Sequence, residues 1–403
     1  MSSFKNLILK FLRLFSLKKR IYLPFGKKFD LVIYDNFFPN PYSGFRLDEF
    51  SYLLKNISKS KAVIEFENAY NFFGLGRQDM QQHINQFRNE FGNELKDKIH
   101  IPGKFHFIRT KILYTPFYYN ILHLFKQLEL FRIPFIVELY PGGGMAFNIS
   151  EIDENLNNIL HSKYCKSVIV NQVCLMNYLI DKKLCEREKI QLIYGLPIKK
   201  EKLEFNFSQK KRWPILKSNV DLCFVAAKYT AGGEDKGYDI FIEVAKKIAP
   251  SFNEVNFHVI GNFGPEDMDI SSIAGKIHFY GKIPSEKLAV HLQNFDIIIA
   301  PNRANKVREG GFDGFPVGCC VEASLAGNVM ITTDPLKENR FYESDEIIIV
   351  DPDIDSIVQR VEELILNPEK LYRIAEKGMI KTKELYSVQD QLESRLKLIS
   401  KYN

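Results

Sequence analysis

The chain has 403 residues, which is more than one hydrophobic core usually serves, so two domains with a cleft between them are expected. Apolar residues make up 45% and charged residues 26% of the sequence, values that exclude a disordered chain. The net charge of +6 suits nucleic acid, anionic lipid or a phosphorylated substrate, but no zinc-finger or RNA-binding signature is present, which argues against nucleic acid.

The cysteines and the hydropathy predict a cytoplasmic protein. The six cysteines form no Cys-x-x-Cys pair and no zinc-ligand spacing with histidine, so we expect reduced thiols. No apolar stretch reaches the roughly 18 to 20 residues of a membrane span, and no small-residue cleavage site follows the apolar N-terminus.

Residues 1–25 form a basic amphipathic segment. Its apolar residues, from Phe4 to Phe15, recur at steps of three and four, and cations such as Lys10 and Arg13 stand between them. A helix of this kind suits the anionic inner face of a membrane, with the cations near the headgroups. The pattern equally suits a helix that packs on its own domain, and the sequence leaves both alternatives open.

After Pro24, short apolar runs alternate with helical stretches, which is typical of βαβ units and a parallel sheet. The predicted strands of this first domain, residues 26–198, are Leu31–Tyr34, Ala62–Phe66, His106–Ile108, Phe135–Leu139, Ser167–Val170 and Ile190–Ile193. Its predicted helices are Asp48–Leu54, Phe117–Phe131 and Cys174–Asp181.

The basic stretch 199–219 has no clear period and is typical of a linker between domains. A second domain, 220–386, has predicted strands Asp221–Ala226, Val255–Ile260, Ile277–Tyr280, Asp296–Ala300, Val329–Thr332 and Ile347–Val350, and helices Ile354–Leu366 and Leu371–Leu385. A charged C-terminal helix, 387–403, is expected to follow. The sequence thus predicts an α/β protein with two Rossmann-like domains, each with a mostly parallel sheet.

Ligands of open α/β sheets bind beyond the carboxyl ends of the strands, so the loops after strands hold the candidate residues. The loop after Val225 contains Lys228, several glycines and Lys236, and then enters a helix. Ammonium groups and helix-start amides are what a diphosphate needs, because its negative charge grows as its bond to a sugar breaks. Two solvated lysines on a mobile loop are the alternative.

A second loop reads Gly-Gly-Phe-Asp-Gly-Phe-Pro from Gly310 to Pro316 and leads into a helix that bears Glu322. The glycines let backbone amides approach a ligand closely. A carboxylate near the helix start can accept two ribose hydroxyl hydrogen bonds, although it can also merely complement the helix dipole.

Two loops of the first domain are candidates for the acceptor side. Gly142, Gly143 and Gly144 follow a predicted strand and let amides face a sugar or an acceptor phosphate, or form a flexible turn. The loop after the first strand carries Tyr42 and Arg46. The tyrosine ring suits a sugar face and the guanidinium a phosphate, while packing between loops explains the aromatic side chains as easily.

As a set, the strand, the lysine loop, the Gly-Phe-Pro turn and the helix with Glu-Ala-x-x-x-Gly resemble the donor domain of family 4 retaining glycosyltransferases. The resemblance covers residues 220 to about 386. It implies the GT-B fold, in which two Rossmann-like domains face each other across a cleft. It also implies that Lys228 and Lys236 are the catalytic cations at the donor diphosphate.

The resemblance assigns further donor-binding residues. Glu322 matches the ribose-binding glutamate, and the backbone of Ile283 lies where the family contacts the base. The turn of Gly314, Phe315 and Pro316 matches the one whose amides approach the transferred sugar. The family has another glutamate eight positions before the ribose-binding one. Gly314 stands at that position here, so Asp313 is the nearest substitute.

The implied function is transfer of a sugar from an NDP-sugar to a glycan or polyprenyl-linked acceptor with retention of configuration, in surface-polysaccharide or glycolipid assembly. No metal ion and no cofactor are expected, and residues 1–20 offer a contact to an anionic membrane. A sugar-nucleotide epimerase of the same architecture and a non-catalytic sugar-nucleotide-binding scaffold remain alternative interpretations.

Overall fold

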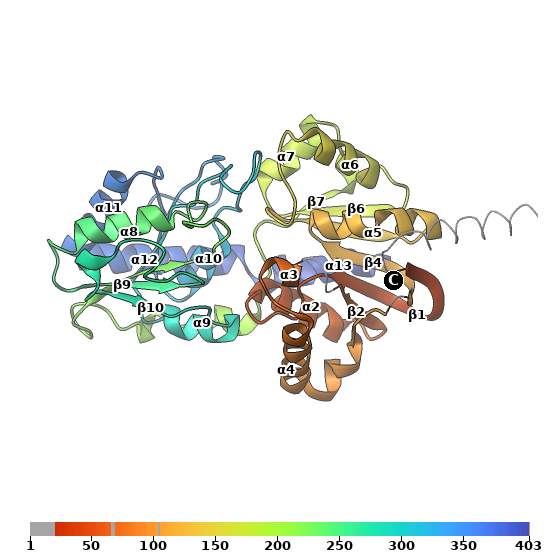
Figure 1. Cartoon of the computed structure of the whole chain (residues 1–403), viewed down its shortest axis with the longest axis horizontal. Helices are drawn as coiled ribbons and strands as arrows, with labels where there is room; N and C mark the ends of the chain where they lie inside the picture. The colour runs from red at the N-terminus through yellow and green to blue at the C-terminus, as the bar shows by residue number, and fades with distance from the viewer. Residues whose placement is uncertain (1–20, 66–68, 104, 403) are drawn as a thin grey trace, which may run out of the picture.

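The computed structural model describes residues 21–65, 69–103 and 105–402 of the chain (Figure 1). The predicted amphipathic helix of residues 1–20 lies outside the described residues. The first strand, β1 (Ile21–Asp35), begins inside the segment 1–25 that the sequence separates from the first domain. It does so because Tyr22 and Leu23 are buried and pair with a neighbouring strand.

The N-terminal sheet has seven parallel strands in the order β3-β2-β1-β4-β5-β6-β7. The strands after β1 are β2 (Ser60–Ile64), β3 (Ile99–His100), β4 (Phe105–Pro116), β5 (Phe135–Leu139), β6 (Cys165–Val170) and β7 (Ile190–Leu192). β2 and β5 are buried at every residue, as expected for a parallel sheet that is covered on both faces.

Helices cover both faces of the N-terminal sheet. One face packs against α5 (Tyr118–Phe131), α6 (Ser150–Leu160) and α7 (Val173–Asp181). The other packs against α2 (Gly44–Asn56) and α4 (Arg77–Leu95), with α3 (Ala69–Phe72) between them in the chain. The sequence did not predict α4 and α6, and β4 is much longer than the predicted strand His106–Ile108.

The C-terminal sheet has six parallel strands in the order β10-β9-β8-β11-β12-β13. They are β8 (Val220–Val225), β9 (Val255–Ile260), β10 (Ile277–Phe279), β11 (Ile297–Ala300), β12 (Val329–Thr332) and β13 (Ile348–Ile349). The helices are α8 (Tyr238–Ile248), α9 (Ser285–Leu292), α10 (Gly318–Leu325), α11 (Ile354–Leu366) and α12 (Pro368–Leu385). The predicted fold class, α/β with two mostly parallel sheets, is confirmed.

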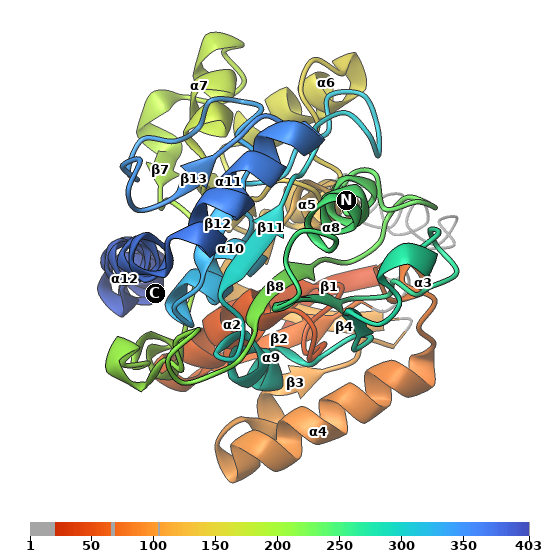
Figure 2. The ribbon, with the colours of Figure 1, turned by 90° about the vertical axis from the view of Figure 1, so that its left-hand side faces the viewer.

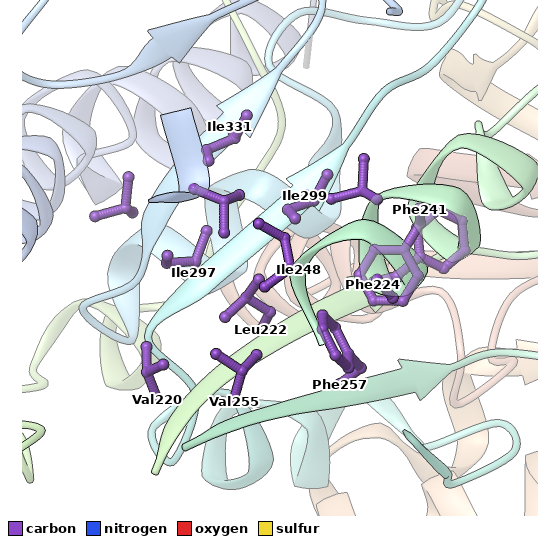
Figure 3. Close-up of a cluster of buried hydrophobic side chains, with 14 of the residues drawn as sticks. Val220, Leu222, Phe224, Phe241, Ile248, Val255, Phe257, Ile297, Ile299 and Ile331 are labelled. Atoms are coloured by element: carbon purple, nitrogen blue, oxygen red, sulfur yellow. The ribbon is translucent and has the colours of Figure 1, made fainter. Parts of the chain in front are cut away.

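Alternation along β8 builds the core of the C-terminal domain. Val220, Leu222 and Phe224 point to the same face, where they meet Phe241 and Ile248 of α8 (Figure 3). All five side chains are buried. The resulting rigid sheet fixes the ends of its strands, and the loops that follow those ends hold the predicted donor residues.

The end of the chain returns to the first domain. After α12, a π-helical turn (Gln389–Glu393) leads into α13 (Ser394–Ser400), which lies beside the N-terminal strands (Figure 1). Leu398 and Ile399 of α13 belong to the same hydrophobic cluster as α2 and α4. The first domain is therefore completed by the last helix of the chain.

In each sheet the order of strands reverses direction once, between β1 and β4 and between β8 and β11. Figure 2 shows β8 and β11 side by side in the C-terminal domain. Ligands of such sheets bind at these switch points, beyond the carboxyl ends of the strands. Within the described ranges, no helix has the length and apolar character needed to cross a membrane.

Candidate active site

Lys236 lies at the switch point of the C-terminal sheet, in the loop between β8 and α8. Its Nζ is 2.7 and 2.8 Å from the two carboxylate oxygens of Asp313, which follows β11. Nδ2 of Asn302 donates to the same carboxylate at 2.6 Å, and the ring centre of Tyr229 is 5.0 Å from Nζ. The fold thus joins two predicted residues that are 77 positions apart in the sequence.

The charge at Lys236 follows from these contacts. Burial alone would lower the pKa of this amine, but Asp313, Tyr229 and Asp235 outweigh that effect and raise the pKa above its ordinary value. Lys236 is therefore an ammonium at neutral pH. An ammonium has three donors, of which Asp313 takes at most two, so a donor is left for an anionic ligand.

Lys228 is held by a different carboxylate. Its Nζ is 2.7 Å from Oδ1 of Asp267, and its backbone N–H donates to Oδ1 of Asn262 at 2.8 Å. The side chain is partly exposed and lies over the ring of Phe263. The structure therefore does not join Lys228 to the pair of Lys236 and Asp313.

Glu322 lies on α10 with one carboxylate oxygen occupied. Its Oε1 accepts from Nζ of Lys202 at 3.2 Å and from Oγ of Ser285 at 3.3 Å. Within the described part of the chain, Oε2 makes no hydrogen bond, which leaves it open to a ligand hydroxyl. Ile283 stands two residues before Ser285, so the predicted base-binding backbone adjoins the predicted ribose carboxylate.

The predicted sugar-binding turn lies between the domains. The backbone N–H of Phe315 donates to Oε1 of Gln172 at 3.1 Å, and the hydroxyl of Tyr194 donates to the carbonyl of Phe315 at 2.7 Å. The peptide from Phe315 to Pro316 is cis. A Cβ on Gly314 would lie 3.5 Å from Cγ of Pro141, so the turn adjoins the glycine loop of the other domain.

The glycine loop needs its glycines. Gly142, Gly143 and Gly144 have φ values of 76°, 51° and 95°, which residues other than glycine rarely adopt. A Cβ on Gly143 would lie 2.1 Å from the ring of Phe117, whereas one on Gly142 would have no heavy atom within 4 Å. The loop is therefore packed on one side and open at Gly142.

Arg46 and Tyr42 have different surroundings. Arg46 is buried: its Nε is 3.2 Å from Asp35, its Nη1 donates to Ser43 at 2.9 Å, and its guanidinium is 4.4 Å from the ring centre of Phe117. The guanidinium is thus engaged within its own domain. Tyr42 is 44% exposed, so its ring is accessible.

Several polar residues contact the predicted ones and were missed from the sequence. Gln172, Lys202 and Ser285 contact predicted residues that are 143, 120 and 37 positions away, and Asn302 contacts Asp313, which is 11 positions away. Gln172 and Asn302 carried a usable signal, because each stands two residues after the end of a predicted strand. The others require knowledge of how the domains meet.

The comparison with sequence families decides the nature of the C-terminal domain. Residues 217–380 match the family described as glycosyl transferases group 1. The C-terminal domain belongs to the group 1 glycosyl transferases. The matched range includes every residue predicted for the donor side, from Lys228 to Glu322. No curated protein matches the chain in sequence.

Solved structures resemble the chain over both domains. HepE of Anabaena in complex with UDP has a TM-score of 0.60 at 13% identity, covering 92% of this chain and 98% of that one. Sucrose-phosphate synthase of Thermosynechococcus elongatus has 0.61 at 12% identity, with coverage of 92% and 98%. A glycosyltransferase of Rickettsia africae has 0.58 at 12% identity, with coverage of 93% and 98%. This likeness confirms the predicted GT-B architecture.

Proposed function

We propose that the chain transfers a sugar from an NDP-sugar to a glycan or lipid-linked acceptor, with retention of configuration. The observation that carries the proposal is the ammonium of Lys236 at the switch point of the C-terminal sheet, across from the N-terminal loops. Group 1 membership of the domain supports it. So does the binding of UDP and glucose by the similarly folded HepE.

The donor diphosphate lies against Lys236 in this proposal. The charge on the diphosphate grows as the glycosidic bond breaks, so a fixed cation there stabilises the transition state more than the ground state. Asp313, which pairs with Lys236, and the turn of Gly314 and Phe315 line a small pocket at this point, and in this proposal they contact the transferred sugar. Lys228 is paired with Asp267, so it contacts the diphosphate in this proposal only when a phosphate oxygen replaces that carboxylate.

The nucleotide ribose binds the free Oε2 of Glu322. Replacing Glu322 by alanine should weaken binding of the matching NDP by about ten- to a hundredfold, because losing a hydrogen-bonded carboxylate costs on the order of 1 to 3 kcal/mol. Calorimetric titration with NDP measures this loss of affinity. The matched control is Glu286→Ala, which removes an exposed ion pair with Lys199 and should leave affinity unchanged. Equal affinity of Glu322→Ala and wild type would refute the ribose assignment.

No divalent cation is required in this proposal, because the ammonium of Lys236 supplies the charge at the diphosphate. Activity should therefore persist, within about twofold, in excess EDTA, whereas a metal-dependent transferase would lose it. Release of NDP from the NDP-sugar is the measurement. Complete loss in EDTA that magnesium or manganese restores would overturn the charge assignment.

The N-terminal domain holds the acceptor. The open space at Gly142 and the exposed ring of Tyr42 support an acceptor glycan beside the donor turn. We further propose that the acceptor is linked to a polyprenyl or other lipid at the inner membrane face, with residues 1–20 on the anionic surface. The basic amphipathic sequence of that segment supports this part of the proposal.

A panel of NDP-sugars tests the proposed function. Each donor is incubated with lipid-linked and free glycan acceptors, and NDP release and product mass are recorded. A product heavier by one sugar, with the anomeric configuration of the donor, is the expected result. Binding of an NDP-sugar without NDP release would favour the scaffold interpretation, and conversion of the sugar without transfer would favour the epimerase.

A further inference from the structure

Lys202 connects the two domains at the donor site. It lies in a short 3-10 turn (Lys200–Leu203) of the linker, and its side chain is only 7% exposed. Its Nζ is 2.9 Å from Oγ of Ser285, 3.1 Å from Oδ2 of Asp48 and 3.2 Å from Oε1 of Glu322. Asp48 belongs to α2 of the N-terminal domain, and the other two acceptors belong to the C-terminal domain. We call these four residues the Lys202 bridge.

The charges in the bridge fix the lysine. All three donors of the ammonium have an acceptor, so its position is fully specified. Burial alone would lower the pKa of Lys202, but Glu322 and Asp48 outweigh burial and raise it, so the side chain stays charged. Moving this cation away would leave two poorly solvated carboxylates without a counter-charge, which is costly.

The surroundings of the bridge hold the domains close at this point. The backbone N–H of Ser285 donates to the carbonyl of Pro41 at 2.8 Å, between the starts of α9 and α2. A Cβ on Gly44 would lie 2.1 Å from Oγ of Ser285 and 3.0 Å from Nζ of Lys202. A side chain at Gly44 would therefore have to displace the side chains of Ser285 and Lys202.

We propose that Lys202 is a positioning residue for nucleotide binding. It holds Oε1 of Glu322 so that Oε2 faces the ribose, and through Asp48 it couples the nucleotide to closure of the N-terminal domain on the donor site. The inference rests on the proposed function, because it needs Glu322 to bind the nucleotide. Two consequences follow: Lys202 acts only through Glu322, and Asp48 acts only through Lys202.

Double-mutant cycles on the full chain test the first consequence. UDP binding is measured by calorimetry, with GDP as a second probe. Lys202→Met should weaken binding about tenfold, as expected when a charged hydrogen bond that orients a ligand group is lost. In a Glu322→Gln background the same substitution should have no further effect, because the oxygen that Lys202 positions no longer carries the charge. Additive losses in the double variant would overturn the proposal.

The second consequence is tested across the domain boundary. The substitution Asp48→Asn on α2 should weaken UDP binding severalfold in the wild-type chain. In the Lys202→Met variant the same substitution should have no further effect. Lys199→Met is the matched control, since its Nζ pairs with Glu286 in the same neighbourhood and should leave affinity within about twofold. Thermal unfolding of every variant identifies misfolded ones, and Lys202→Gln replaces Lys202→Met if the latter does not fold. Unchanged affinity in Asp48→Asn would overturn the coupling.

These outcomes separate the inference from the proposed function. If the wild-type chain binds no nucleoside diphosphate, the proposed function fails and the inference fails with it. If the wild type binds and Glu322→Gln weakens binding while Lys202→Met does not, the inference alone is wrong.

Discussion

Replacing Lys236 by alanine is expected to lower turnover by about a hundredfold or more, the largest effect of any single change at the donor site. The loss should fall mainly on turnover and less on donor affinity, because the negative charge on the diphosphate is greatest when the sugar departs. Folding should tolerate the change, since Asp313 is about one-third exposed and keeps its hydrogen bond from Asn302.

Steady-state NDP release, combined with calorimetric binding of the NDP-sugar, separates these two effects. Lys246→Ala is the matched control, because Lys246 pairs with Glu243 on the outer side of α8, away from the loop, and should keep turnover within about twofold. If the Lys236→Ala variant is as active as this control, Lys236 does not contact the diphosphate, and the central assignment of the donor site is wrong.

The second large effect concerns stability. Arg395→Met should destabilise the N-terminal domain by about 3 to 5 kcal/mol, the usual cost of leaving a buried carboxylate without its partner. Arg395 of α13 is fully buried and donates from Nη2 to Oε1 of Glu138 at 2.6 Å and from Nη1 to the carbonyl of Gln391 at 2.9 Å. Chemical denaturation followed by circular dichroism measures the loss. Arg360→Met, which breaks a surface pair with Glu363, should cost less than about 1 kcal/mol.

Glu49 provides a further check on the same cluster. The hydroxyl of Tyr114 lies between carboxylate oxygens of Glu49 and Glu138 and has one proton for two acceptors, which favours a proton on one of the two carboxyls. Burial, with Glu138 beside it, raises the pKa of Glu49 from 4.5 to about 8, although Arg395 opposes the shift. Because the folded chain binds this proton more tightly, stability should fall as pH rises from about 4.5 to 8. Glu49→Gln should flatten that slope, and an unchanged slope would contradict the assignment.

Strands that are buried on both faces were predictable from the sequence. β5, β9 and β12 have the predicted limits because short, mainly apolar runs between polar loops leave little freedom. β4 was underestimated, since the cations Arg109 and Lys111 interrupt its apolar run while their side chains stay exposed. The helix α4 was missed although its apolar residues recur at helical steps, because most of its surface is polar.

The residues of the candidate site also differ in how far the sequence could predict them. Residues that follow a strand end, such as Lys236 and Asp313, could be proposed from position and chemistry, and the fold brings these two together. Contacts that depend on how the domains meet could not be predicted. Lys202 and Glu322 are 120 residues apart, and nothing in the basic linker distinguishes Lys202 from Lys200 until the structure places it.

The return of α13 to the first domain has a consequence for synthesis on the ribosome. Glu138 is made 257 residues before Arg395. At about 5 to 20 residues per second, the N-terminal sheet waits on the order of 13 to 50 seconds for its last helix. During that interval Glu138 lacks its partner Arg395, and the hydrophobic face that receives Leu398 and Ile399 is uncovered. Until α13 docks, this uncovered face is open to chaperones or to other copies of the chain, and a tag that delays docking of α13 should lower the soluble yield.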